Sequence, residues 1–512
     1  MTFKTGLIAA LLMTTVTAPA LAETLKEAMA AAYASNPEIT AARAGQRLSD
    51  EELVRAKANI LPSLNSQTVF DQETSSPGTL NDESRLFNST VELRQPIYRG
   101  GQTVNGIRAA DRRVLAGREQ LRATENQLIF DTVQAYLNVL SDQSEVELTS
   151  GNVRVLERQL QASTDRFEVG DVTRTDVAQS EARLALARSQ AIAAEGNLQV
   201  SRNAYQRIVG RPPVDLQPPP PLPPLPQTQA EAVAFALQGS PFVISARLAE
   251  EAARFDVKGA RGARLPTLDA TFSVGYSNFR GLNNTIIGPT GPVDPANPGN
   301  PDPSNVPIVS QRFSNIEFTQ NIGVTMTIPL YAKGQLGSQI RSTKARALQL
   351  REQAVGAERN AVDQVRTAFE NLLSARATIR AATVAVDAND LALEGTRAEQ
   401  TVGTRNILDV LNAEQELLNA QVQLVRAERN SYVAAYALLA AIGQAEVDNL
   451  AVPVEQYNAP RYLDRADDRW FDWAAEFDTQ PVTTMPLEPG PLAAGAQPQT
   501  SDDVNVMSEG EN

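Results

Sequence analysis

Apolar residues recur at intervals of seven in two long stretches of the chain. In the first stretch, residues 101–167, the interval is broken once, by the eleven positions from Leu128 to Val139. The second stretch has the same break, from Ala361 to Leu372. Apolar heptads predict long helices that pack side by side, and an insertion of four residues locally unwinds their supercoil. We therefore expect two long helices of the same design.

Each long helical pattern is interrupted at a glycine, Gly170 or Gly403, and a second helical pattern follows at once. A helix that ends at glycine and restarts gives a tight antiparallel hairpin. A shorter helix also precedes each hairpin, and together with the returning arm it would match the length of the long arm. The hairpins are expected at about 99–210 and 332–443, and the shorter helices at about 37–60 and 241–264.

Apolar and polar residues alternate between the short helices and the hairpins. The alternation is clearest at 268–276 and 316–328 and weaker at 87–97. A period of two predicts β-strands, either in a soluble hairpin with one buried face or in a membrane with one face to lipid. We expect one strand pair at about 63–97 and a second at about 266–330.

The chain also repeats itself. QPIYRGGQ at 95–102 corresponds to IPLYAKGQ at 328–335, and this shift of 233 positions stays constant through both hairpins. In both copies a proline and a glycine mark the passage from strand to helix: Pro96 and Gly101, then Pro329 and Gly334. The period is too long for a solenoid and indicates two equivalent halves of one architecture.

The halves are residues 23–211 and 228–446, and a proline-rich linker at 212–227 joins them. The composition of this linker predicts an extended polyproline connection. Upstream of the strands the shift between the halves is 204, so the second half has 29 additional residues. They fall at 281–311, between its two strands, and predict a long loop without regular structure.

The two ends of the chain have distinct compositions. Residues 1–22 carry Lys4, an apolar run and a final Ala-Leu-Ala, which predicts a cleaved signal peptide and a location outside the cytoplasm. No later stretch has the roughly 18 apolar residues that a membrane helix needs. Residues 447–512 form an acidic tail that we expect to be partly disordered.

The composition excludes several classes of function. The chain has no cysteine and no histidine, which excludes disulfides, Cys-His and Ser-His-Asp catalysis, and the common zinc sites. Its formal net charge of −14 argues against nucleic acid as a partner. We therefore predict no enzymatic activity, no cofactor and no metal site.

The predicted strands limit how the chain can cross a membrane. Four strands cannot close a membrane barrel, and open strand edges are not tolerated in lipid. If these strands span a membrane, several chains must share one barrel, and their hairpins would then form a tube. One alternative class stays open. A periplasmic coiled-coil adaptor or structural rod would share the hairpins without needing strands or a duplication. A secreted enzyme would need a concentrated polar motif, which this chain lacks.

Three elements form a specific set: the repeated strand-to-helix element, the turn FEVGDVTRTDV at 167–177, and VGTRNILDVLNAEQELLNAQ at 402–421. With them, nearly the whole mature chain resembles the TolC family of outer-membrane exit ducts. This resemblance implies a mainly α-helical fold with a membrane β-barrel portion. Specifically, it implies a homotrimer whose strands, four from each chain, share one barrel in outer-membrane lipid, with an α-helical barrel extending into the periplasm.

The resemblance also implies a function and partners. It implies a passive channel for efflux or type I secretion in a Gram-negative outer membrane. A periplasmic adaptor (a membrane fusion protein) and an inner-membrane pump, either an ABC exporter or a proton-driven transporter, would open the channel at its periplasmic tip. The cargo, small molecules or an unfolded protein, is left open.

In this family the hairpin tips form the periplasmic entrance. By resemblance, Arg405 is a latch that links to Thr175 and Asp176 of the neighbouring protomer. A guanidinium can bond a hydroxyl and a carboxylate together, and an exposed pair is weak enough for a partner to break. Asp409 matches a carboxylate at the pore constriction.

Two positions depart from the family pattern. Gln400 stands where the family has a latch tyrosine, and Asn412 stands where it has a second pore aspartate, so we expect a looser closure and a less negative constriction. The remaining tip residues are expected to receive the adaptor: Gly170, Val402, Gly403 and Thr404.

Overall fold

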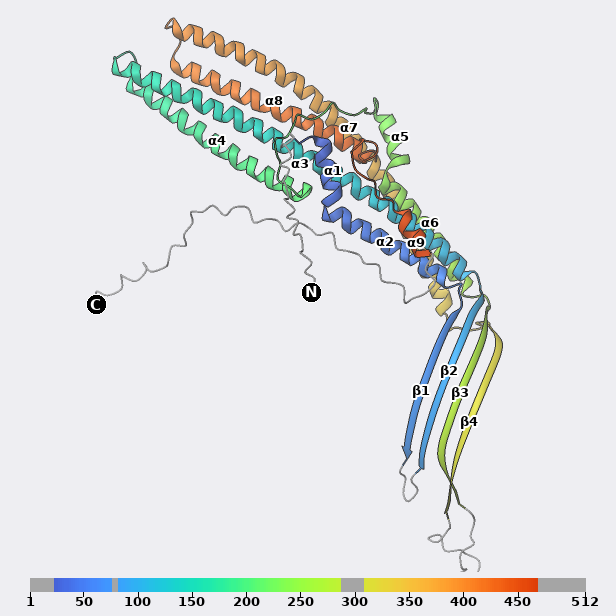
Figure 1. Cartoon of the computed structure of the whole chain (residues 1–512). Coiled ribbons are helices and arrows are strands. Elements are labelled where there is room, and N and C mark those ends of the chain that lie inside the picture. The colour runs from blue at the N-terminus through green and yellow to red at the C-terminus, as the bar shows by residue number, and fades with distance from the viewer. Residues whose placement is uncertain (1–22, 76–81, 287–307, 468–512) are drawn as a thin grey trace, which may run out of the picture. The chain divides into compact units, whose positions relative to one another are not determined.

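The chain folds into helices and one sheet (Figure 1). The computed structural model describes residues 23–75, 82–286 and 308–467. In chain order the elements are α1 (Leu25–Ser35), α2 (Pro37–Ala58), β1 (Ser63–Ser75), β2 (Asp82–Arg99), α3 (Gln102–Glu168), α4 (Arg174–Val209), α5 (Gln229–Gly239), α6 (Pro241–Gly262), β3 (Thr267–Ile286), β4 (Ile308–Thr327), α7 (Gln335–Thr401), α8 (Ile407–Ala441) and α9 (Pro460–Asp467). Three predicted segments lie wholly or partly outside the described residues: the signal peptide at 1–22, residues 287–307 of the loop, and residues 468–512 of the tail.

The long helices α3 and α7 have 67 residues each. At 1.5 Å per residue, each spans on the order of 100 Å. Each begins after a glycine, Gly101 or Gly334, whose φ of 79° is left-handed and therefore suits glycine. The helices α4 and α8 return antiparallel beside them (Figure 1). The structure thus contains two long helical hairpins.

Shorter helices extend the returning arms end to end. The side-chain amide of Asn36 donates to the carbonyl of Ile208 at 2.9 Å, so the start of α2 meets the end of α4. The start of α6 meets the end of α8 in the same way, with Gly443 packed against Gly239 and Pro241. Within the described residues no single helix is long and apolar enough to cross a membrane, and only α5 and α6 together, across a bend of 41°, meet that criterion.

The main core lies where both long helices pass α1, α4, α5 and α8. The fully buried Tyr136 of α3 holds two other segments there, because its hydroxyl lies 2.9 Å from the carbonyl oxygen of Glu23 and 2.7 Å from that of Gln217. Leu216 of the proline-rich linker is buried in the same core. The linker has no helix or strand, and it packs against the core along part of its length.

The four strands form one antiparallel sheet in the order β1-β2-β3-β4. The strands β3 and β4 remain paired as far as Ile286 and Ile308. The predicted loop at 281–311 was therefore too long, because residues 281–286 and 308–311 continue the backbone ladder of the sheet. Backbone pairing between strands does not require apolar side chains, so the pattern of apolar residues does not detect it.

The two faces of the sheet differ in polarity. One row across all four strands is apolar: Leu64, Leu93, Phe272 and Ile322. The next row, which points to the opposite face, is polar: Asn65, Glu92, Ser273 and Asn321. All four apolar side chains are exposed in a single chain. One face of this sheet consequently needs an apolar environment.

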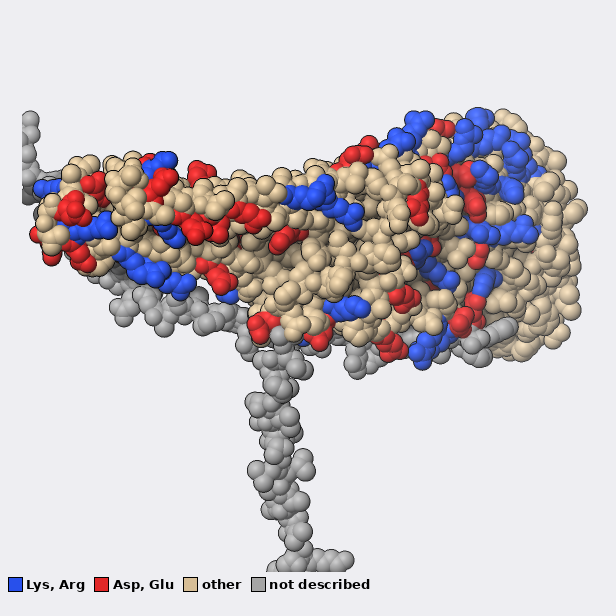
Figure 2. Space-filling model, turned by 90° about the horizontal axis from the view of Figure 1, so that it is seen from above, with Lys and Arg blue, Asp and Glu red and all other residues tan. Residues whose placement is uncertain are grey.

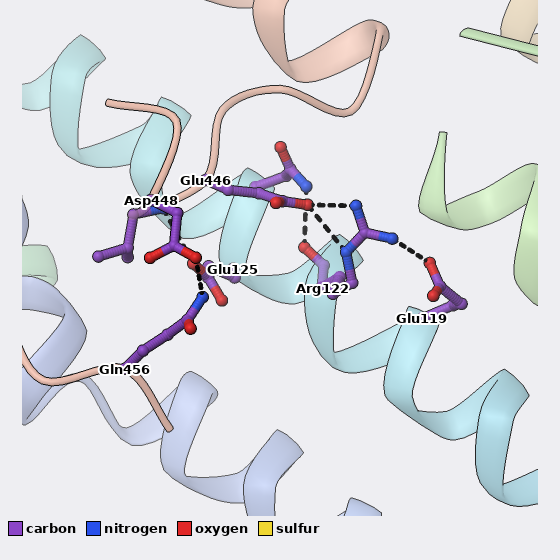
Figure 3. Close-up of polar contacts among 8 residues, drawn as sticks. Glu119, Arg122, Glu125, Glu446, Asp448 and Gln456 are labelled. Carbon is purple, nitrogen blue, oxygen red and sulfur yellow. Dashed lines mark hydrogen bonds and ion pairs between the residues drawn. The ribbon is translucent and has the colours of Figure 1, made fainter. Parts of the chain in front are cut away.

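The segment after α8 is fastened to α3 by charged side chains (Figure 3). Arg122 lies between two carboxylates, at 2.6 Å from both Glu119 and Glu446. The buried carboxylate of Glu125 accepts the backbone N–H of Val447 at 3.0 Å. Burial raises the pKa of Glu125 above its ordinary value, because burial disfavours the charged form. Residues 447–467 of the predicted tail are thus part of the folded body, and they end in α9, which packs on α2.

Candidate functional site: the two hairpin tips

The two hairpins turn with the same backbone geometry. Gly170 and Gly403 have φ values of 84° and 83°. In the first tip the N–H of Asp171 donates to the carbonyl of Arg166 at 2.8 Å, and in the second that of Thr404 donates to Glu399 at 3.0 Å. Such bonds satisfy the last carbonyls of a helix only when the capping residue is left-handed, which explains the glycine in both copies.

In the first tip, Asp176 helps to cap the start of α4. Its carboxylate accepts from the backbone N–H of Thr173 at 2.9 Å and from the Thr173 hydroxyl at 2.8 Å, and the hydroxyl in turn caps the N–H of Asp176. This reciprocal arrangement is a capping box. Thr175 is exposed beside it. Within one chain, therefore, Asp176 acts as a helix cap, and the side chain of Thr175 points to solvent.

In the second tip, Arg405 is held by its own loop. Its guanidinium donates to the carboxylate of Glu399 at 2.8 Å and lies 3.9 Å from that of Asp409. All three side chains are about half exposed, so each pair is weak. Val402 stands at the apex and is three-quarters exposed.

A groove of about 580 Å³ separates the two tips of one chain. Asp176 and Arg405 both line it, as do Gln400 and Gly403, whereas Thr175 does not. Of the predicted latch residues, the structure therefore brings Asp176, Gln400 and Arg405 to one groove, although Asp176 and Arg405 do not bond each other within the chain.

Below the tips, polar and apolar contacts join the two hairpins. Arg183 of α4 donates to the side-chain oxygen of Asn412 on α8 at 2.7 Å. Beside this bond, residues of α3, α4 and α8 form a small apolar cluster: Leu156, Leu184, Ala187, Ile407 and Leu411. Asp409 lies three positions before Asn412, so both occupy one face of α8. The two predicted constriction residues are thus neighbours.

The sequence reasoning missed three residues at this site. Glu399 holds Arg405, Arg183 holds Asn412, and the nearly buried Glu414 binds Arg397 at 2.9 Å. The contact of Glu399 could have been predicted, because an acidic residue six positions before Arg405 flanks the same short turn. The contact of Arg183 could not, since Arg183 is 229 positions from Asn412 in the sequence. Among the described residues no group of acidic side chains is arranged to hold a metal ion.

The comparisons with known proteins agree with this architecture. The sequence profile described as "Outer membrane efflux protein" matches residues 28–211 and 233–444. The chain is similar to the outer membrane efflux protein BepC of Brucella suis, with 33% identity over 88% of this chain and 92% of that protein. It is also similar to the outer membrane protein TolC of Escherichia coli, with 26% identity over 84% of both chains.

A solved structure shares the fold. The outer membrane channel CmeC of Campylobacter jejuni superposes with a TM-score of 0.69, covering 87% of this chain and 89% of that one at 16% identity. The predicted TolC resemblance is confirmed. With the profile covering both halves, the chain belongs to the outer membrane efflux protein family, whose TolC-like members are exit ducts of the outer membrane that extend into the periplasm.

Proposed function

We propose that three copies of this chain form one exit duct, with a shared β-barrel in the outer membrane and a helical tube in the periplasm. The observation that carries this proposal is the sheet, which has two open edges and one apolar face. In lipid every backbone polar group needs a partner, so the free edges of β1 and β4 must each pair with another chain. The family resemblance supports three chains.

The polarity of the sheet supports its position in the membrane. The apolar row that contains Leu93 and Phe272 would face lipid, and the polar row that contains Glu92 and Ser273 would face the lumen. Aromatic contacts reinforce the apolar face, where the rings of Phe87 and Phe318 both pack edge-on against Tyr276. This division is the one expected of a water-filled barrel.

The order of the helices supports the tube. The helix α3 contacts α4 and α2 on one side and α8 and α6 on the other, while α7 contacts α8 and α6. The helices therefore form a layer, with α7 at one edge and the stacked α4 and α2 at the other. Three such layers joined edge to edge would enclose a lumen and continue the barrel.

The tips supply the gate in this proposal. Arg405 would leave Glu399 and bind Thr175 and Asp176 of the neighbouring protomer when the entrance closes. Gln400, in place of a tyrosine, leaves this closure dependent on the arginine. Asp409 would face the axis near the tips, where three carboxylates attract cations.

The remaining partners act on this gate. A periplasmic adaptor would dock at the exposed tip loops around Gly170 and Val402–Thr404, and an inner-membrane pump would supply the energy. The relative BepC is named an efflux protein, whereas AprF of Pseudomonas aeruginosa is named an alkaline protease secretion protein, so both kinds of cargo stay open.

Planar-bilayer conductance tests the gate. An exposed ion pair contributes about 0.2–1 kcal/mol, and three equal latches act on one aperture. Arg405→Gln should therefore raise the resting conductance at least a few-fold, and Arg174→Gln, on the first tip, is the matched control. Equal conductance of wild type and Arg405→Gln would remove Arg405 from the gate.

A further inference from the structure

Exposed basic side chains gather where the helices meet the sheet. We name six that make no ion pair with any described residue the basic collar: Arg55, Arg108, Arg261, Arg264, Lys333 and Arg341. Each lies within about two helical turns of a helix end that adjoins a strand. On the face shown in Figure 2, Lys and Arg gather toward the end that adjoins the strands. The chain as a whole is acidic, with a net charge of −14, so this excess is local.

Helix dipoles explain only part of the basic collar. Basic residues are favourable at the C-terminal end of a helix, which accounts for Arg55 in α2 and Arg261 in α6. The helices α3 and α7, however, begin at the sheet, where the dipole favours acidic residues. Neither has an acidic residue in its first turn, whereas α4 and α8, which begin at the tips, have Asp176 and Asp409 there. A second cause must favour positive charge at the sheet end.

Both copies of the duplication carry a basic residue near the start of the long helix, where the helix adjoins the sheet. Arg108 and Arg341 are related by the shift of 233, and each is the seventh residue of its long helix. Between Glu317 and Glu352 the second copy has five basic residues and no acidic one. Basic side chains that lie close together without an ion-pair partner repel one another unless an anion lies between them.

Two arginines of the basic collar show this crowding. A Cβ built on Gly337 would lie 3.3 Å from a guanidinium nitrogen of Arg341 and 3.7 Å from one of Arg264. The two guanidinium groups thus flank one small residue, and neither has an acidic partner among the described residues. Planar guanidinium groups of this kind bind phosphate through paired hydrogen bonds.

Aromatic residues mark the same level. Tyr98 and Tyr331 are also related by the shift of 233. Tyr98 is the second-last residue of β2, and Tyr331 lies between β4 and α7. They are 47% and 85% exposed. Tyrosine is enriched at the boundary between lipid and water, where its ring is among headgroups. From the sheet toward the helices, the apolar strands therefore come first, the tyrosines next and the basic collar last. A chain that leaves a membrane through its headgroup layer requires this order.

We propose that the basic collar binds the phosphate groups of anionic phospholipid headgroups at the periplasmic surface of the outer membrane. This inference rests on the proposed function, in which the sheet crosses that membrane. The collar then fixes the depth of the barrel, because the arginines bond the headgroups while the sheet stays in the hydrocarbon layer.

The test is the affinity of the detergent-extracted protein for phosphatidylglycerol and for phosphatidylcholine, measured by native mass spectrometry. Wild type should prefer phosphatidylglycerol. The variant Arg261→Gln/Arg264→Gln/Arg341→Gln should bind it about 100-fold more weakly per protomer, since each basic residue near an anionic lipid surface contributes about 1 kcal/mol. A control with the same loss of charge, Arg366→Gln/Arg376→Gln/Arg380→Gln, alters exposed arginines of α7 farther from the sheet and should keep the wild-type preference.

Three results would overturn the proposal: equal affinity of wild type for both lipids, an undiminished preference in the collar variant, or an equal loss in the control. If the collar variant fails to assemble, the single variants Arg261→Gln and Arg341→Gln replace it. Assembly defects with unchanged lipid preference in those variants would assign the collar to contacts between copies of the chain. The proposed function has a separate test. It would be contradicted if the wild-type protein gave no conductance in planar bilayers.

Discussion

Arg183 on α4 donates a hydrogen bond of 2.7 Å to the side-chain oxygen of Asn412 on α8, and this bond joins the two hairpins of one chain below their tips. Asn412 stands where the resemblance places a second pore aspartate. In this chain the position holds a link between hairpins, and the arginine beside it offsets negative charge near the proposed constriction.

Asn412→Asp should raise the cation selectivity of the channel only in part. The new carboxylate would pair with Arg183, in a contact worth at most about 1 kcal/mol at this exposed site, so that the arginine no longer offsets other negative charge. Arg183→Gln/Asn412→Asp should raise cation selectivity further, because the carboxylate then has no partner. Reversal potentials in a salt gradient measure both. Equal selectivity of the two variants would show that Arg183 does not control the charge of this position.

Glu399→Gln should lower the resting conductance. Glu399 holds Arg405 at 2.8 Å within its own tip, and this contact competes with the proposed latch to the neighbouring protomer. Removing the competitor should stabilise the closed entrance by about 0.2–1 kcal/mol for each latch. The matched control is Glu394→Gln, an exposed glutamate farther down α7. An increase in conductance would mean that Glu399 itself closes the entrance.

The two tips illustrate what the sequence can predict. Gly170 and Gly403 located both turns, because glycine is favoured wherever a helix ends in a left-handed residue. The heptad pattern likewise located both long helices, since local periodicity determines which face is buried. By contrast, the bond of Arg183 to Asn412 depends on the packing of two hairpins distant in sequence, and no local pattern records it.

The ends of β3 and β4 show a second limit. Their last paired residues are held by backbone hydrogen bonds. They fall within 281–311, where the additional residues of the second half predicted a loop, although the ladder continues through them. In the linker, one apolar side chain, Leu216, is enough to anchor a segment whose prolines predicted only an extended connection.

Gly262→Ala should destabilise the junction between helices and sheet. Gly262 packs directly against the backbone of Gly100, and a Cβ at position 262 would overlap its carbonyl oxygen. A backbone shift there costs about 1–3 kcal/mol. Gly196→Ala, at an open position inside α4, should instead stabilise by up to about 1 kcal/mol. The dissociation temperature of the extracted complex measures both. A Gly262→Ala complex as stable as wild type would contradict the close approach.

Glu125→Gln should make stability less dependent on pH. Burial raises the pKa of Glu125 in the folded chain, with smaller contributions from Glu446 and Asp448, while the Val447 N–H opposes the shift. The folded state therefore binds this proton more tightly than the unfolded state, and the free energy of unfolding falls as pH rises through the raised pKa. Below the ordinary value of 4.5 this penalty is absent.

Denaturant unfolding of Glu125→Gln should consequently show a smaller loss of stability between about pH 5 and pH 8 than wild type. Glu416→Gln, which removes an exposed carboxyl of α8, should keep the wild-type dependence. A steeper dependence in Glu125→Gln would reverse the assigned sign.

The most direct measurement of the shared barrel is the mass of the complex formed by disulfides between β1 and β4. The chain has no cysteine, so every disulfide would come from introduced residues. One cysteine replaces Thr319 or Thr325 on β4, and a second is moved along β1 from Ser63 to Glu73. We predict that one register gives covalently linked dimers and trimers and no larger species. Monomers alone in every register would contradict a barrel closed by neighbouring chains.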